Sequence, residues 1–136
     1  MDEETIINLL LDLTNYHGLS WYKPIVTDGT EVGGTFERYC TKLPKQNDLL
    51  FVVGKSLIYE DLYSLVCHDG KGIAFSVVSK EMKNKYLLRS LYDTASEIVR
   101  KKILNRVGEI LQGQINNNHA QTDLKSSSDD NTKSSS

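Results

Sequence analysis

The stretch LYSLVCHDGKGIAFSVV, residues 62 to 78, constrains the fold of this chain more than any other part of the sequence. Two apolar runs flank the segment DGKG, and Asp-Gly between such runs is a strong signal for a β-hairpin. Strand alternation places Tyr63, Leu65 and Cys67 on one face of the first run, yet neither face of the hairpin is strongly polar. The hairpin therefore predicts a sheet that helices cover on both faces.

Ahead of the hairpin, two segments have clear local signals. Residues 3 to 17 predict a helix, because Asp2 can cap it and Ile and Leu recur at helical spacing. The same run is rich enough in Ile and Leu to form a buried strand, so that alternative stays open. Residues 21 to 26 favour a strand, and Asp28-Gly29 then supplies a tight turn.

The middle of the chain predicts one short helix and three strands. Residues 35 to 43 have apolar side chains at helical spacing and precede Pro44, which favours a short helix. The strands are expected at 49 to 53, at 57 to 67 with an interruption near Glu60 and Asp61, and at 72 to 79.

A long C-terminal helix should cover the sheet, because apolar residues recur every three or four positions between Leu88 and Leu111. Gly108 weakens this helix, which suggests a break near Asn105. Residues 116 to 136 are dominated by Asn, Asp and Ser and are expected to be disordered. The chain thus predicts a single domain, 1 to 115, with a tail in which an acidic context favours phosphorylation of Ser126 and Ser127.

Composition excludes some partners. The net charge of −2 lacks the strongly basic character that nucleic-acid binding requires, so we expect no nucleic-acid partner. A local basic surface is nevertheless expected, which could meet an acidic protein or anionic lipid headgroups. Two cysteines, an acidic N-terminus and apolar runs of at most five residues favour a cytoplasmic protein. The basic residues are Lys80, Lys83, Lys85, Arg89, Arg100, Lys101, Lys102 and Arg106.

Chemical motifs are weak in this sequence. Cys67 and His68 adjoin, but consecutive strand residues point to opposite faces, so a thiol nucleophile there would need a base from elsewhere. The cysteines and histidines are too scattered to predict a metal site, and no cofactor motif is complete. We expect no catalytic, metal or cofactor-binding residue, with a small enzyme using Cys67 or His68 as the alternative.

Residues 63 to 99, YSLVCHDGKGIAFSVVSKEMKNKYLLRSLYDTASEIV, resemble the second half of longin domains, as in R-SNAREs and small subunits of the TRAPP tethering complex. The segment KLP, residues 42 to 44, is similar to the end of the first longin helix. A helix at residues 3 to 17 departs from that family and is instead similar to roadblock domains. Both resemblances imply a profilin-like α/β (α+β) architecture, with a five-stranded antiparallel sheet between helices.

The resemblance also implies a function. Longin and roadblock domains are non-enzymatic and act through protein surfaces, so the expected role is an adaptor or complex subunit in membrane trafficking or small-GTPase regulation. Its partners would be proteins, in a hetero- or homo-oligomer, on cytoplasmic endomembrane surfaces. A membrane-surface module that binds lipid through the basic helix is a further alternative.

Overall fold

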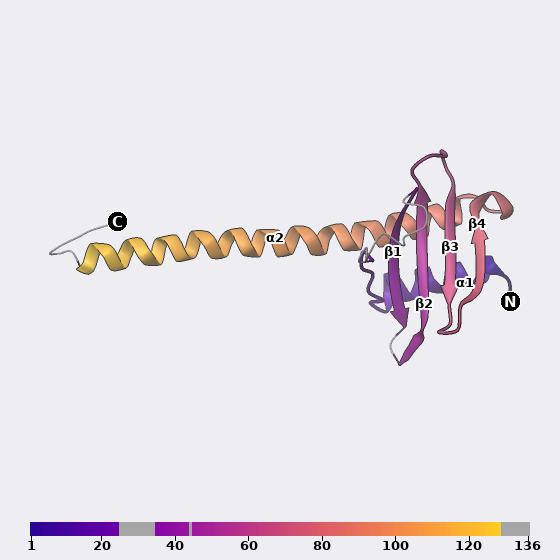
Figure 1. Cartoon of the computed structure of the whole chain (residues 1–136), viewed down its shortest axis with the longest axis horizontal. Helices are drawn as coiled ribbons and strands as arrows, with labels where there is room; N and C mark the ends of the chain where they lie inside the picture. Colours follow the sequence, from indigo (N-terminus) through magenta and orange to yellow (C-terminus); the bar gives the residue numbers. More distant parts are fainter. Residues whose placement is uncertain (25–34, 44, 129–136) are drawn as a thin grey trace. The chain divides into compact units, whose positions relative to one another are not determined.

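The computed structural model describes residues 1–24, 35–43 and 45–128 (Figure 1). The chain divides into two compact units, Met1–Val99 and Arg100–Ser136, which we describe separately. The elements are α1 (Glu3–Tyr16), β1 (Phe36–Leu43), β2 (Gln46–Ser56), β3 (Tyr63–His68), β4 (Ile73–Val78), the 3-10 turn η1 (Ser79–Glu81) and α2 (Tyr86–Ser128).

The first helix forms as its sequence predicts. The Asp2 carboxylate accepts a hydrogen bond from the backbone N–H of Thr5 at 2.9 Å, and Glu3 and Glu4 occupy the first turn, where the helix dipole favours negative charge. The helix ends at Tyr16, before Gly18, which adopts φ +71°. The strand alternative for residues 3 to 17 is therefore wrong.

The four strands form an antiparallel meander in the order β1-β2-β3-β4. The predicted hairpin is confirmed: Leu65 pairs with Val77 and Cys67 with Phe75 across β3 and β4. In its turn, the Asp69 N–H donates to the Gly72 carbonyl at 3.0 Å, and Gly70 adopts φ +90°.

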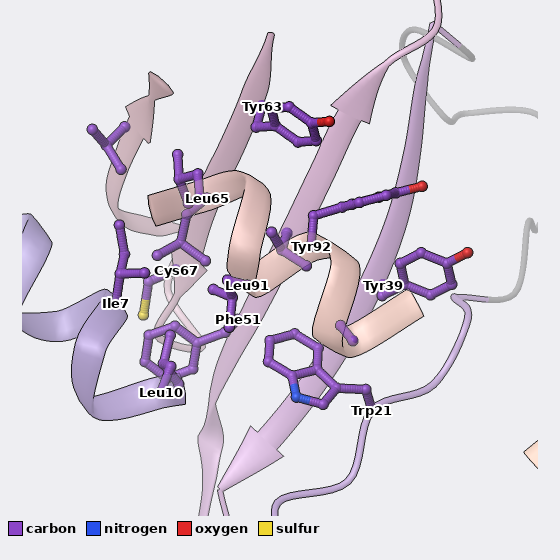
Figure 2. Packing of buried hydrophobic residues seen from close by; sticks show 14 of the residues in the cluster. Ile7, Leu10, Trp21, Tyr39, Phe51, Tyr63, Leu65, Cys67, Leu91 and Tyr92 are labelled. Carbon is purple, nitrogen blue, oxygen red and sulfur yellow. The ribbon is translucent and has the colours of Figure 1, made fainter. Parts of the chain in front are cut away.

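One face of this sheet carries the hydrophobic core. Figure 2 shows Phe51, Leu65 and Cys67 from the strands packed with Ile7 of α1 and Leu91 of α2. Both helices contribute to this one cluster, and Figure 1 shows α1 and the start of α2 on the same side of the sheet. The prediction of helices on both faces is therefore wrong for the described residues. On the opposite face, Ser64 and Val66 of β3 are only half-buried.

Residues 35 to 43 form a strand, which corrects the predicted short helix. Tyr39 pairs with Val53 and Thr41 with Phe51, so β1 gains a ladder along most of β2. Aromatic and β-branched side chains in this segment favour a strand once a partner is present. The strand predicted at 49 to 53 is confirmed within β2, and the strand at 72 to 79 is confirmed as β4.

The fold class is therefore α+β with a four-stranded sheet, and the expected five strands and longin or roadblock architecture are not what the described residues form. Tyr22 forms an isolated antiparallel bridge with Cys40, which places the expected N-terminal strand beside β1. The rest of that strand and the Asp28-Gly29 turn lie outside the described residues.

The last helix runs without a break through Asn105, against the prediction. Its first part, up to Val99, belongs to the first unit, where Leu88, Leu91 and Ala95 are fully buried. The helix continues to Ser128, beyond the position at which disorder was expected to begin. The disorder of residues 116 to 136 stays a prediction.

Candidate interaction surfaces

The thiol and imidazole of the hairpin are not brought together for catalysis. Cys67 points into the core with 3% of its surface exposed, whereas His68 is half-buried and follows it on the strand. Burial raises the pKa of the Cys67 thiol, and the negative charge of Asp69 raises it further. Because the thiolate is the nucleophilic form, this environment disfavours Cys67 as a nucleophile. Among the described residues, no group of three or more His, Cys, Asp or Glu side chains is placed to hold a metal ion.

The predicted basic residues fall into three places. Lys80, Lys85 and Arg89 line one hollow in the first unit. Lys83 instead lines a hollow beside the acidic start of α1, with Asp2, Glu3 and Glu4. The other four, Arg100, Lys101, Lys102 and Arg106, belong to the second unit. Ser126 and Ser127 fall in the last turn of α2, and their phosphorylation stays a prediction.

An exposed apolar loop joins β2 to β3, where the sequence predicted the beginning of a strand. Leu57, Ile58 and Tyr59 are 62%, 64% and 67% exposed. The Ser56 hydroxyl holds the loop in shape by accepting hydrogen bonds from the N–H groups of Ile58 at 3.1 Å and Tyr59 at 2.9 Å. Asp61 closes the loop with φ +56°. The interruption predicted near Glu60 and Asp61 is in fact the end of a loop, and the strand begins only at Tyr63.

A hollow of about 300 Å³ lies where this loop approaches η1 and the start of α2. Its charged lining consists of Lys80, Lys85 and Arg89 together with Asp61, and Tyr63 and Tyr86 provide aromatic surface. A second hollow, along Leu57, Ile58 and Tyr59, shares Asp61, Tyr63 and Arg89 with the first, so the two adjoin. We call the combined feature the loop cleft.

The floor of the loop cleft is fixed by hydrogen bonds. The buried Ser79 hydroxyl accepts from the Tyr63 N–H at 3.0 Å and donates to the Asp61 carbonyl at 3.2 Å. The Tyr63 ring also packs against Tyr92 of α2, with ring centroids 5.6 Å apart. The Ser79 hydroxyl is therefore engaged within the fold, and the basic side chains at the cleft are those of Lys80, Lys85 and Arg89.

Behind this floor, a carboxylate joins β1 to α2. Glu37 Oε1 accepts hydrogen bonds from the Tyr92 hydroxyl at 2.5 Å and the Tyr39 hydroxyl at 3.2 Å. The Tyr92 hydrogen bond lowers the pKa of Glu37, while burial raises the pKa of Tyr92. The Ser96 hydroxyl lies 3.4 Å from the Tyr39 hydroxyl, which extends the network along α2. We regard this network as structural because it fastens the helix that carries Arg89.

The second unit presents a different surface. Six large aliphatic side chains between residues 103 and 115 are 46% to 59% exposed. On a helix with 3.6 residues per turn these positions fall within an arc of about 140°, which is broad for a coiled-coil seam. We call this surface the aliphatic stripe: Ile103, Leu104, Val107, Ile110, Leu111 and Ile115.

No family model matches this chain, and neither a curated protein nor a solved structure matches it. Across the described residues, no helix combines the length and apolar character that crossing a bilayer requires.

Proposed function

We propose that this chain is a non-enzymatic subunit of a protein assembly, which binds its partner through the aliphatic stripe. The observation that carries the proposal is the exposure of all six stripe side chains, each close to half or more. Helices in proteins are stabilised chiefly by packing an apolar face against other elements, rather than by helix propensity. A partner that covers the stripe would provide that stabilisation.

Covering the stripe would supply part of the free energy that a complex needs. Burying the exposed half of one large aliphatic side chain contributes roughly 0.7–1.5 kcal/mol, so six contribute roughly 4–9 kcal/mol. Association itself costs an estimated ~4–15 kcal/mol, so further contacts must add to the stripe.

Charge favours a partner other than a second copy. Residues 100 to 118 contain Arg100, Lys101, Lys102 and Arg106 against the single acidic Glu109, a net charge of +3. Pairing two copies would bring these basic groups together, whereas acidic side chains beside the apolar face of another helix would complement them. The breadth of the stripe suits a groove between two helices. The proposed occupant is therefore an amphipathic helical pair of another protein, with acidic flanks.

The narrower role in membrane trafficking or small-GTPase regulation, at cytoplasmic endomembrane surfaces, rests on the resemblance of residues 63 to 99 alone. The sheet with both helices on one face departs from the architecture that the resemblance implies. We retain trafficking as the first cellular context to test.

The test is affinity capture of the full chain with matched variants. Leu104→Glu with Leu111→Glu places two charges in the stripe, whereas Asn105→Glu with Gln112→Glu places the same charges on the opposite side of the helix. We expect the first pair to abolish a stoichiometric partner and the second to retain it. The retained partner should also protect amides of residues 100 to 115 from hydrogen exchange. Equal capture by both variants, or a homo-oligomer in light scattering, would refute the proposal.

A further inference from the structure

We propose that the loop cleft is a second binding site, which takes a short acidic peptide carrying aliphatic or aromatic side chains. It rests on the proposed function only in that the ligand is another protein. The cleft lies in the first unit, whereas the aliphatic stripe lies in the second.

The excess of positive charge at the cleft favours an anionic ligand. Among the described residues, neither Lys80 nor Lys85 is paired with a carboxylate. Arg89 lies 3.8 Å from Asp93, but both side chains are more than half exposed, so this pair is weak and the guanidinium can exchange partners. Asp61 is the acidic group in the same lining, which leaves an excess of positive charge. The guanidinium fork suits a carboxylate or a phosphate, and two lysines beside it extend the basic surface.

The cleft also presents apolar surface, which favours a ligand with aliphatic or aromatic side chains. Leu57, Ile58 and Tyr59 line one of the two hollows, and Tyr86, which is 70% exposed, lines the other. Three consecutive exposed apolar residues on a loop that hydrogen bonds hold in place form a preorganised contact surface. The hollow of about 300 Å³ is at the lower end of the size of ligand pockets and could admit one large side chain.

An acidic peptide fits these features better than an anionic membrane. Glu60 and Asp61 directly follow the apolar triplet and line the same hollow, so insertion of the loop into a membrane would bring two carboxylates to a negative surface. A peptide can instead direct its acidic groups to Lys80, Lys85 and Arg89 and avoid Glu60. The concave shape of the cleft also suits a side chain rather than a flat bilayer.

The experiment measures fluorescence anisotropy of a labelled peptide of about 12 residues, with Asp and Glu alternating with Leu and Phe, against the full chain. We expect saturable binding that weakens at least about fivefold between low and high salt. A peptide with Lys and Arg in place of the acidic residues should bind at least about tenfold more weakly. No saturable binding, or equal binding of both peptides, would overturn the proposal.

Matched variants locate the site. Lys80→Glu with Lys85→Glu should weaken binding at least about tenfold, whereas Lys83→Glu, which faces the acidic start of α1, should change it less than about twofold. Ile58→Ser should weaken binding at least about threefold, and Ile73→Ser, at the same 64% exposure, should have little effect.

Three outcomes separate the explanations. The stripe variant with Leu104→Glu and Leu111→Glu should bind the peptide normally, so failure of the partner proposal would not mimic failure at the cleft. Equal losses with Lys83→Glu and with the cleft variants would show non-specific attraction and overturn the proposal. Sedimentation with anionic phosphatidylserine vesicles that Ile58→Ser abolishes, without peptide binding, would assign the loop to a membrane and also overturn it.

Discussion

Truncation to Ala should lower the stability of the protein strongly at one leucine of α2 and hardly at all at another. Leu91 is fully buried in the core beneath the sheet, and Leu104 is 55% exposed in the aliphatic stripe. Both lie in one helix, so their intrinsic helix propensity is the same and only their surroundings differ. The comparison therefore tests whether the first unit uses α2 for stability while the second presents it to a partner.

The magnitudes follow from burial. Leu91→Ala removes a fully buried side chain and leaves a cavity, which costs roughly 2–5 kcal/mol. Leu104→Ala removes a side chain that is half exposed, and we expect a loss of at most about 0.5 kcal/mol. In a folded unit of this size, about 1 kcal/mol shifts Tm by roughly 4–8 °C, so Leu91→Ala should lower Tm by at least about 8 °C.

The assay is guanidinium unfolding followed by the fluorescence of Trp21, the single tryptophan, which is fully buried in the first unit. We expect a lower midpoint for Leu91→Ala with an unchanged slope, and an almost unchanged midpoint for Leu104→Ala. Partner capture should show the reverse order, because Leu104 contributes to the stripe. Equal loss of stability in both variants would mean that Leu104 is core, and a loss below about 1 kcal/mol for Leu91→Ala would contradict the described packing.

Three further predictions concern individual groups. The hydrogen bond from the Tyr92 hydroxyl lowers the pKa of Glu37 in the folded state. The ionised Glu37 carboxylate therefore stabilises the fold above the unfolded pKa, and this contribution is lost as pH falls through the folded pKa. Denaturant midpoints of Glu37→Gln should depend less on pH than those of the wild type between about pH 5 and about pH 3. Iodoacetamide should modify Cys67 slowly in the native protein and rapidly in denaturant, since burial raises its pKa, and mass spectrometry that finds rapid native labelling would contradict this environment. Gly70→Ala should cost roughly 1–2 kcal/mol in thermal unfolding because Gly70 adopts φ +90°, and an unchanged Tm would count against the assigned turn.

Local signals in the sequence were sufficient for several elements. Asp2 and its helix were predictable because the cap and the first turn involve residues three apart. The β3–β4 hairpin was predictable because its turn and both strands lie within one short stretch.

Other features depended on residues far apart in the sequence. The segment around Tyr39 has helical spacing but becomes β1, because pairing with β2 satisfies its backbone and buries its aromatic side chain. The loop cleft was only half predictable: Lys80, Lys85 and Arg89 were named as basic residues, but their meeting with Ile58 depends on how β2 and β3 are joined. Nothing local to Lys83 distinguished it from its neighbours, and only the acidic start of α1 does so.

By itself, the sequence determined the elements whose hydrogen bonds close within a few residues. It also predicted that the apolar residues from Leu88 to Leu111 cover the sheet, which is correct only up to Val99, because the side chains of the aliphatic stripe are exposed. The tertiary structure decided which face of the sheet received both helices and which basic side chains share a cleft. The physical reason is that local hydrogen bonds and turn preferences depend on neighbouring residues, whereas the burial of a side chain depends on contacts between segments far apart in the sequence.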